Sequence, residues 1–392
     1  MDHKKMEIAS RIENISPSVT LSIDSKAKAL KAEGVDVCSF GAGEPDMDTP
    51  EHIKEAAQRA LAEGFTKYTP SSGIPELRKA ISKKFATDNS LHYAPHQIVV
   101  SNGAKHSCFN AIAALINPGD EVIIPAPYWV SYPEMVRLAS GVPVFVETKF
   151  ENSWKLTVEE FENAMTPLTK MVIINSPGNP TGSVYSKEEL RALSELAAEE
   201  DIYILSDEIY EKLVYDETEH VSIASLTPEA YDLTVTVNGF SKAYSMTGWR
   251  IGYIGAPEPV AQAIDSLQSH STSNPCSFAQ MGALAALTSD QQCVTDMRDE
   301  FDMRRQYMFE RLNAINGIKT ILPKGAFYML VDISSFGLNS QNFADRLLSK
   351  AKVSVVPGIA FGNDQTIRLS YATSLDVIKR GLDRLEDFCK TL

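Results

Sequence analysis

The 392-residue sequence has no apolar run of about 18 residues, the length that a membrane-spanning helix requires. Its first ten residues, MDHKKMEIAS, contain no apolar stretch of signal-peptide length. We therefore expect no membrane partner and a cytoplasmic location. Cysteine is also scarce, because the five cysteines form no C-x-x-C pair in this long chain. Such cysteines are interpreted as reduced thiols, and no metal site is predicted.

The sequence has fewer basic than acidic residues. The sequence has 37 Lys and Arg against 51 Asp and Glu, for a formal net charge of −14. A protein whose main partner is nucleic acid or an anionic membrane presents a basic surface. The composition therefore argues against a nucleic-acid partner. Any anionic ligand must be bound by local groups, against the overall charge.

The motifs of several enzyme classes are absent as well. The sequence contains no Walker A motif, no H-E-x-x-H and no G-x-S-x-G. The glycine-rich segment GAGEPD at 41–46 lacks the third glycine of a dinucleotide-binding fingerprint. These absences exclude the commonest nucleotide-binding, zinc-protease and α/β-hydrolase interpretations.

What is present from about residue 97 is an alternation of short β-branched runs with longer amphipathic stretches. The predicted strands are 97–101, 121–125, 142–147, 171–175, 202–206, 233–240 and 251–255. The predicted helices among them are 103–116, about 130–139, 158–165 and 186–199. Several strands are apolar at consecutive positions, which is typical of strands covered on both faces. The pattern predicts a doubly wound α/β domain with a mainly parallel sheet.

After about residue 257 the pattern changes to long helical segments at 258–268, 277–288 and 290–315. Short strands then mix with helices at 341–351 and from 374, which predicts a smaller α+β domain. The first 45 residues hold a helix-like segment and the strand-like VDVCSF at 35–40, and we expect them to pack on the smaller domain or on a partner subunit. The expected division is a large domain of residues 46–285 and a discontinuous small domain of residues 1–45 and 286–392.

Ligands of open α/β sheets bind beyond the carboxyl ends of the strands, so the residues that follow each strand were compared. They are a glycine turn that opens a helix (102–105), an aromatic ring, an amide, a carboxylate and two cations. The last five are Trp129, Asn179, Asp207, Lys242 and Arg250. Each has an ordinary alternative, such as a tight turn, core packing, a helix cap or a surface cation. Together they match pyridoxal phosphate, whose sites combine a Schiff-base lysine, an acidic partner for the ring nitrogen and a phosphate cradle.

Longer motifs in the same regions resemble a known family. They are GAGEPDMDTP (41–50), KYTPSSGIPELR (67–78), SNGAK (101–105), PAPYWVSYPEM (125–135), NSPGNPTG (175–182), SDEIY (206–210), SKAYSMTGWRIGY (241–253) and IRLSYATS (367–374). In this order they resemble the class I aminotransferases, and within them the bacterial aspartate aminotransferases. The resemblance implies the pyridoxal-phosphate-dependent transferase fold of type I, in which the large domain has a seven-stranded sheet flanked by helices.

The resemblance also implies roles in cofactor binding. Lys242 would be the Schiff-base lysine and the catalytic acid and base, Asp207 would hold the ring nitrogen protonated, and Trp129 would stack on the ring. Asn179 and Tyr210 would bind the phenolic oxygen. The remaining implied cofactor contacts gather at the phosphate or beside it: Gly103, Ala104, Lys105, Ser241, Arg250 and, from a neighbouring subunit, Tyr68. The assignment of Tyr68 makes a homodimer part of the hypothesis.

For the substrate, the resemblance implies that Arg368 binds the α-carboxylate and that Gly43 approaches it closely, with Trp129 and Asn179 alongside. Many aspartate aminotransferases bind the distal carboxylate with an arginine of the partner subunit, but the corresponding region here, 266–277, contains no arginine. The branch that this sequence resembles uses a lysine and a threonine instead. These match Lys105 and Thr20.

The implied reaction is a ping-pong transfer of the amino group from L-aspartate to 2-oxoglutarate, so the expected partners are amino acids and 2-oxo acids. Three other aminotransferase specificities, for prephenate, aromatic amino acids or alanine, stay open, as does a β-lyase. A non-catalytic regulator with this fold would carry a basic helix-turn-helix module ahead of it. We disfavour that class because the family motifs begin near the N-terminus and the chain is acidic.

Overall fold

A seven-stranded sheet forms the centre of the larger part of the molecule in this computed structural model, which describes residues 8–13, 15 and 19–392 but not the side chains of residues 10, 19–22 and 24. The strand order is β2 (Ile98–Ser101), β8 (Gly252–Gly255), β7 (Thr234–Gly239), β6 (Tyr203–Asp207), β5 (Thr169–Asn175), β3 (Glu121–Ala126) and β4 (Val142–Glu147). Only β8 runs antiparallel to its neighbours within this sheet. The predicted α/β class and the mainly parallel sheet are confirmed.

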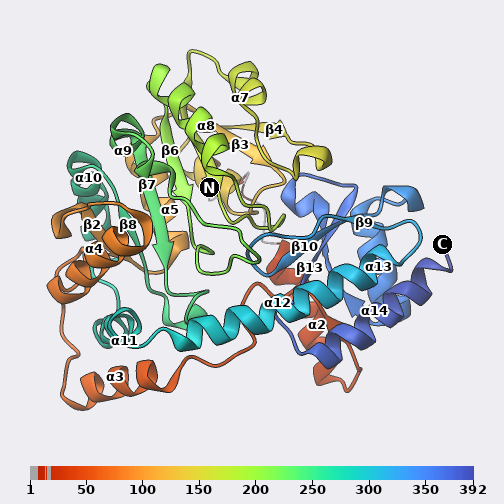
Figure 1. Cartoon of the computed structure of the whole chain (residues 1–392). Helices are drawn as coiled ribbons and strands as arrows, with labels where there is room; N and C mark the ends of the chain where they lie inside the picture. Colours follow the sequence, from red (N-terminus) through yellow and green to blue (C-terminus); the bar gives the residue numbers. More distant parts are fainter. Residues whose placement is uncertain (1–7, 14, 16–18) are drawn as a thin grey trace, which may run out of the picture.

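Helices cover both faces of this sheet (Figure 1). Helices α5 (Ala104–Leu115), α6 (Tyr132–Leu138) and α10 (Glu258–Ser269) pack on one face. The opposite face is covered by α4 (Pro75–Asn89), α7 (Val158–Ala164), α8 (Lys187–Glu199), α9 (Pro228–Leu233) and α11 (Ser277–Thr288). Successive residues of β5 enter different cores: Met171 packs with the first set and Val172 with the second. This two-sided burial explains why the strands are apolar at consecutive positions.

A second, four-stranded sheet lies in the smaller part of the molecule. It is antiparallel, in the order β12 (Val356–Pro357), β13 (Thr366–Ser370), β10 (Tyr328–Asp332) and β9 (Lys319–Thr320). Helix α13 (Ser340–Ala351) packs beside it, and α14 (Leu375–Cys389) packs on α13 and on α12 (Gln292–Asn313). The N-terminal segment joins this part, as expected, since β1 (Cys38–Ser39) pairs with β11 (Val353–Ser354) and α2 (Val19–Ala32) contacts β11 and β12. The remaining short helix near the N-terminus is α1 (Ser10–Glu13).

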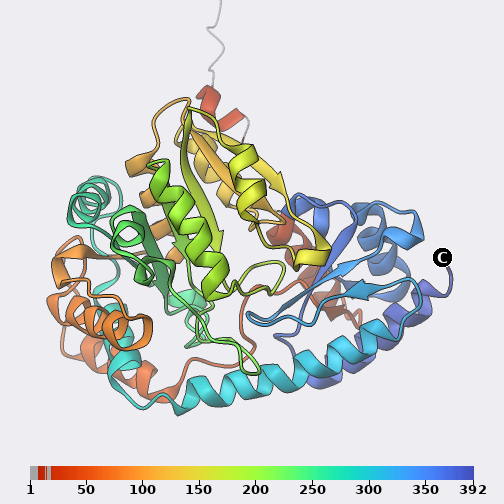
Figure 2. The same ribbon diagram turned by 45° about the horizontal axis from the view of Figure 1, so that its top comes forward.

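One long helix, α12 (Gln292–Asn313), links the two parts (Figures 1 and 2). It starts beside α11 and ends among α14 and β9. Its buried residues Phe301 and Met308 enter the core of the smaller part, together with Phe327, Tyr371 and the side chain of Tyr210, which follows β6. The core of the smaller part therefore extends to the carboxyl end of the seven-stranded sheet.

Four helices were not predicted from the sequence: the short α1 and α9, and the longer α3 (Glu51–Ala62) and α4. The buried residues of α3, Ile53, Ala57 and Ala60, have the spacing of one helix face. Two of the three are alanines, whose small side chains make the apolar face hard to recognise in the sequence. Helix α3 buries them against α11. No helix in the described part of the chain is long and apolar enough to cross a membrane.

Candidate active site

A cavity of about 610 Å³ opens where the carboxyl ends of β5, β6 and β7 meet the four-stranded sheet. Eleven of the residues predicted for the site line it: Gly43, Ala104, Lys105, Trp129, Asn179, Asp207, Tyr210, Ser241, Lys242, Arg250 and Arg368. They come from segments far apart in the chain. The carboxyl ends of the strands therefore border the cavity, as predicted, and the smaller part adds Arg368 from β13.

Lys242 follows strand β7 and extends into this cavity. Its amine donates a hydrogen bond to the carbonyl oxygen of Gly43, and Nζ lies 5.8 Å from the ring centre of Tyr210. Burial lowers the pKa of Lys242 to about 8, and the positive charges of Arg368 and Arg250 act in the same direction. Glu44 and Asp207 oppose this shift. A lysine with such a pKa has an appreciable neutral, nucleophilic fraction near neutral pH.

Asp207 is the last residue of β6 and is only 3% exposed. Its Oδ2 accepts a hydrogen bond of 2.7 Å from the hydroxyl of Tyr132, and the thiol of Cys108 lies 3.8 Å from the same oxygen. Its Oδ1 accepts from the backbone N–H of Ile209. Burial raises the pKa of Asp207, whereas these three donors lower it.

Arg368 and Asn179 approach each other across the cavity. Arg368 Nη1 donates to Asn179 Oδ1 over 3.0 Å, and Nη2 donates to the carbonyl oxygen of Gly41 over 2.9 Å. The guanidinium lies 4.3 Å from the ring centre of Tyr328. Its Nε has no hydrogen-bond partner among the described residues, although the side chain is buried. A buried cation with a free donor is suited to bind a carboxylate.

Tyr210 forms a hydroxyl pair with Tyr328. The two oxygens are 2.8 Å apart, and both side chains are buried. Burial and the neighbouring hydroxyl raise the pKa of Tyr210 well above its ordinary value, so it keeps its proton. Tyr210 can therefore donate a hydrogen bond to an oxygen in the cavity.

The glycine turn opens helix α5 as predicted, with Gly103 as the residue before the helix. Gly103 has φ of +88°, and a Cβ atom at this position would lie 2.3 Å from Arg250 Nη2. Arg250 Nη1 donates to the carbonyl oxygen of Thr247 and Nη2 to that of Asn102. The absence of a side chain at 103 thus lets a guanidinium lie beside a helix N-terminus. Both groups favour an anion such as phosphate.

Lys105 places its amine 5.0 Å from the ring centre of Trp129. Burial lowers the pKa of Lys105, and Arg250 adds to the effect. The ring of Trp129 packs edge to face with Tyr132, with 5.1 Å between ring centres. Lys105 therefore adds a further cation to the cavity, beside the guanidinium groups of Arg368 and Arg250.

Two predicted residues of the described part of the chain, Tyr68 and Gly103, do not line this cavity. Tyr68 is 93% exposed and does not line it, so a role for Tyr68 requires another copy of the chain. The side chain of Thr20 lies outside the described residues, although its backbone belongs to α2. Gly103 lies next to Arg250, which lines the cavity.

Sequence reasoning missed Tyr132, Cys108, Tyr328 and Asn175. Asn175 donates from Nδ2 to the carbonyl oxygen of Asp207 and accepts at Oδ1 from the backbone N–H of Asn179, so it fixes the loop that carries the predicted amide. Asn175 ends a strand and could have been found by the strand-end rule. Cys108 and Tyr132 lie within predicted helices and Tyr328 within a short apolar segment, so the strand-end rule did not point to them.

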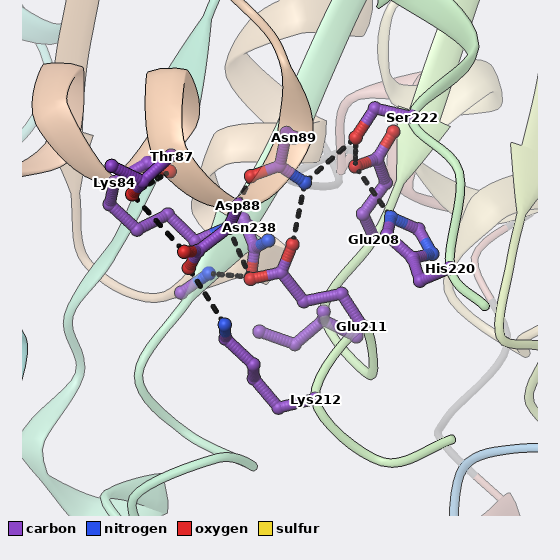
Figure 3. A network of polar contacts seen from close by, with 12 residues as sticks. Lys84, Thr87, Asp88, Asn89, Glu208, Glu211, Lys212, His220, Ser222 and Asn238 are labelled. Atoms are coloured by element: carbon purple, nitrogen blue, oxygen red, sulfur yellow. Dashed lines mark hydrogen bonds and ion pairs between the residues drawn. The ribbon is translucent and has the colours of Figure 1, made fainter. Parts of the chain in front are cut away.

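A buried polar network lies behind the site (Figure 3). Glu208 and Glu211 flank Ile209 and Tyr210 in the chain, do not line the cavity and belong to this network. Glu208 accepts hydrogen bonds from Ser206 and Ser222 and pairs with His220. Glu211 pairs with Lys84 and accepts from Asn89.

The atoms that Glu208, Glu211 and His220 could offer to a metal all lie within 4.8 Å of one another. Each carboxylate oxygen is already hydrogen-bonded or ion-paired to protein groups, however. The arrangement is therefore a support for the Asp207–Tyr210 segment.

Known proteins resemble this chain over nearly its whole length. The family model for class I and II aminotransferases matches residues 35–385. The chain belongs to this aminotransferase family. An aspartate aminotransferase of Bacillus sp. strain YM-2 is 48% identical over 98% of this chain and 99% of its own length. An aspartate/prephenate aminotransferase of Thermus thermophilus is 48% identical over 96% of this chain and 97% of its own length.

Solved structures of the family have the same fold. The aspartate aminotransferase of Thermus thermophilus with maleate superposes with a TM-score of 0.94 at 46% identity, over 99% of this chain and 100% of that one. The fold is therefore the pyridoxal-phosphate-dependent transferase fold of type I, as predicted. The chain is an aminotransferase, an enzyme of a family that depends on pyridoxal phosphate.

The residues present fit this cofactor by their chemistry. The buried Asp207 carboxylate suits a protonated ring nitrogen, and the amine of Lys242 suits an aldehyde. The space left by Gly103, with the Arg250 guanidinium beside the N-terminus of α5, suits a phosphate. These groups share one cavity, as a single ligand requires.

Proposed function

We propose that this protein is an aspartate aminotransferase, which transfers the amino group of L-aspartate to 2-oxoglutarate and releases oxaloacetate and L-glutamate. One observation carries the proposal: the cavity combines the amine of Lys242 and the carboxylate of Asp207 with several cations, among them Arg368 and Lys105. A dicarboxylic amino acid needs two cationic contacts. The names of the similar proteins from Bacillus and Thermus support this choice of substrate.

The cofactor, when bound, supplies an aldehyde that condenses with amines and a ring that accepts electrons from the substrate Cα. Asp207 would keep a proton on the ring nitrogen, and Asn179 and Tyr210 would donate to the phenolic oxygen. Trp129 would cover one face of the ring. The phosphate would be bound by Gly103, Ala104, Ser241 and Arg250, with Lys105 near them and Tyr68 of the partner subunit completing the set.

Lys242 would move the proton between the substrate Cα and the cofactor. A general base works best when its pKa is near the operating pH, and burial brings the pKa of Lys242 to about 8. The Gly43 carbonyl oxygen accepts a hydrogen bond from the Lys242 amine. Cofactor binding at Lys242 would displace this contact.

Arg368 would bind the α-carboxylate of the substrate. Its unpartnered Nε offers one donor, and a carboxylate could replace the Asn179 or Gly41 oxygen for a second. Gly43 would approach the same carboxylate, with Trp129 and Asn179 close to it. Lys105, together with the predicted Thr20, would bind the distal carboxylate. Closure of the smaller part over the substrate would exclude water.

Prephenate is the second candidate substrate, because one similar protein is named for aspartate and prephenate together. Its second carboxylate would meet the same Lys105. Aromatic amino acids and alanine have only one carboxylate and would leave Lys105 without a partner. Comparison of dicarboxylic with monocarboxylic substrates therefore decides between these alternatives.

Half-reaction rates with aspartate, alanine, phenylalanine and prephenate should be measured in the wild type and in Lys105→Met. We expect the variant to lose aspartate reactivity by about 10- to 100-fold, the scale of a hydrogen bond to a charged group, and to change little toward alanine. Lys54→Met, which removes an exposed lysine paired with Glu51, is the matched control. An unchanged aspartate rate together with a preference for a monocarboxylic substrate would overturn the proposal.

We also propose a homodimer and the division into a large domain of residues 46–285 and a small domain of residues 1–45 and 286–392. The exposed ring of Tyr68 supports the dimer, and the separate core of the smaller part supports the division. Helix α11 continues to Thr288, just past the proposed boundary.

Sedimentation equilibrium of the purified protein tests the proposed homodimer. The cytoplasmic location stays a prediction.

A further inference from the structure

The two carboxylate oxygens of Asp207 have different environments, because Tyr132 and Cys108 both contact the same one. Its Oδ2 faces Tyr132 at 2.7 Å and Cys108 at 3.8 Å. Among the described residues, its Oδ1 accepts only the longer bond of 3.2 Å from the backbone N–H of Ile209. Oδ1 therefore keeps more acceptor capacity for a ligand in the cavity that Asp207 lines.

Both donors come from helices on the same face of the sheet. Cys108 lies in α5, and Tyr132 is the first residue of α6. Cys108 is fully buried and Tyr132 is 2% exposed. The ring of Tyr132 is held edge to face against Trp129, so the direction of its hydroxyl is fixed by packing.

These two groups remain protonated at any ordinary pH. Burial raises the pKa of Tyr132 well above its usual value, and the charge of Asp207 raises it further. Burial and Asp207 act on Cys108 in the same way. Both side chains therefore act as donors toward Asp207, and donors stabilise the ionised form of a carboxylate.

We propose that Tyr132, assisted by Cys108, is a positioning residue that keeps the buried Asp207 carboxylate ionised and turned toward the ring nitrogen of the cofactor. This inference rests on the proposed role of Asp207. Removal of the hydroxyl would leave a buried carboxylate with one donor fewer. Asp207 would then take the shared proton more readily, and the cofactor ring would lose positive charge and electron-accepting strength.

The test compares Tyr132→Phe with the wild-type holoenzyme. The substitution keeps the ring that packs on Trp129 and removes only the hydroxyl. We expect kcat to fall about tenfold with little change in KM, the effect of losing one charge-assisted hydrogen bond. The absorbance of the bound cofactor reports the pKa of the nitrogen that would join it to Lys242. We expect this pKa to rise by roughly half to one pH unit in Tyr132→Phe, because a less positive ring withdraws less charge from that nitrogen. Cys108→Ala should shift both values in the same direction by a smaller amount.

Tyr93→Phe is the matched control. Tyr93 is also a buried tyrosine of the larger part, but its hydroxyl pairs with Thr236 and lies away from the cavity. It should leave both this pKa and kcat unchanged. Wild-type values of kcat and of this pKa in Tyr132→Phe would overturn the inference while leaving the proposed function intact. Failure of the wild type itself to bind the cofactor would instead overturn the proposed function.

Discussion

Arg368 Nη1 donates a hydrogen bond to Asn179 Oδ1 over 3.0 Å, and this bond joins strand β13 of the four-stranded sheet to the loop after β5 of the seven-stranded sheet. The two residues are separated by 189 positions in the chain. The carboxylate-binding candidate and the predicted cofactor-binding amide are therefore in direct contact. Binding at either residue is expected to affect the other.

Arg368→Lys should lower kcat/KM for the preferred amino acid by roughly 10- to 100-fold, because lysine offers no planar pair of donors to a carboxylate. Steady-state kinetics checks this result. Arg380→Lys is the control, since Arg380 binds Asp36 on the surface of the smaller part. Equal kcat/KM values in Arg368→Lys and the wild type would contradict the proposed role of Arg368.

The pH dependence of Lys242 follows from its lowered pKa. Burial favours the neutral amine, so Lys242 in the cofactor-free protein should lose its proton near pH 8, well below the ordinary value of about 10.4. The initial rate of labelling by pyridoxal phosphate and borohydride should therefore rise through a midpoint near pH 8. Lys242→Ala should abolish the specific label. A midpoint near 10, or a label on another lysine, would refute the prediction.

Gly103→Ala should weaken cofactor binding by about tenfold or more, because the new Cβ would displace the Arg250 guanidinium. Gly119→Ala is a matched control. Gly119 also has positive φ, at +91°, but an added Cβ there meets no atom within 4 Å. Both variants place a Cβ at positive φ, which costs roughly 1–2 kcal/mol, and Gly103→Ala alone also displaces Arg250. Absorbance titration with pyridoxal phosphate measures the difference, and equal dissociation constants would contradict the prediction.

The buried pair of Lys84 and Glu211 should affect stability. Lys84→Met leaves Glu211 buried without its cation, and the expected loss in the free energy of unfolding is about 3–5 kcal/mol. Urea denaturation checks this value. The double variant Lys84→Met/Glu211→Gln should recover part of the loss, because it leaves no uncompensated charge. The exposed Lys54→Met should have no measurable effect, and a similarly silent Lys84→Met would refute the argument.

The same pair predicts an acid limit of stability. Burial opposes ionisation of Glu211, but the charges of Lys84, His220 and Lys212 prevail and lower its pKa to about 2. A carboxylate whose pKa is lower in the folded state stabilises the protein above its unfolded pKa, near 4.5. This contribution is lost progressively as the pH falls toward 2. The difference in stability between the wild type and Glu211→Gln should therefore shrink over that interval.

Much of the fold was evident from local patterns. The seven strands of the central sheet were predicted because their apolar β-branched runs are local and strong. The strand-end rule then placed Trp129, Asn179, Asp207 and Lys242 at one edge of the sheet. Helix α3 escaped prediction because its buried face is mainly alanine, whose hydrophobic signal is weak.

The sequence by itself determined which chemical groups the site contains, since the motifs carry the amine, the carboxylate, the amide and the cations in a recognisable order. Only the tertiary structure decided which neighbouring groups set the orientation and the pKa of these side chains. Tyr132 and Cys108 reach Asp207 from positions 75 and 99 residues away, and Tyr328 reaches Tyr210 from 118 residues away. No local pattern specifies such contacts, because they depend on how helices and sheets pack. Likewise the shift in the pKa of Lys242 arises from burial, which exists only once the two parts of the molecule enclose the cavity.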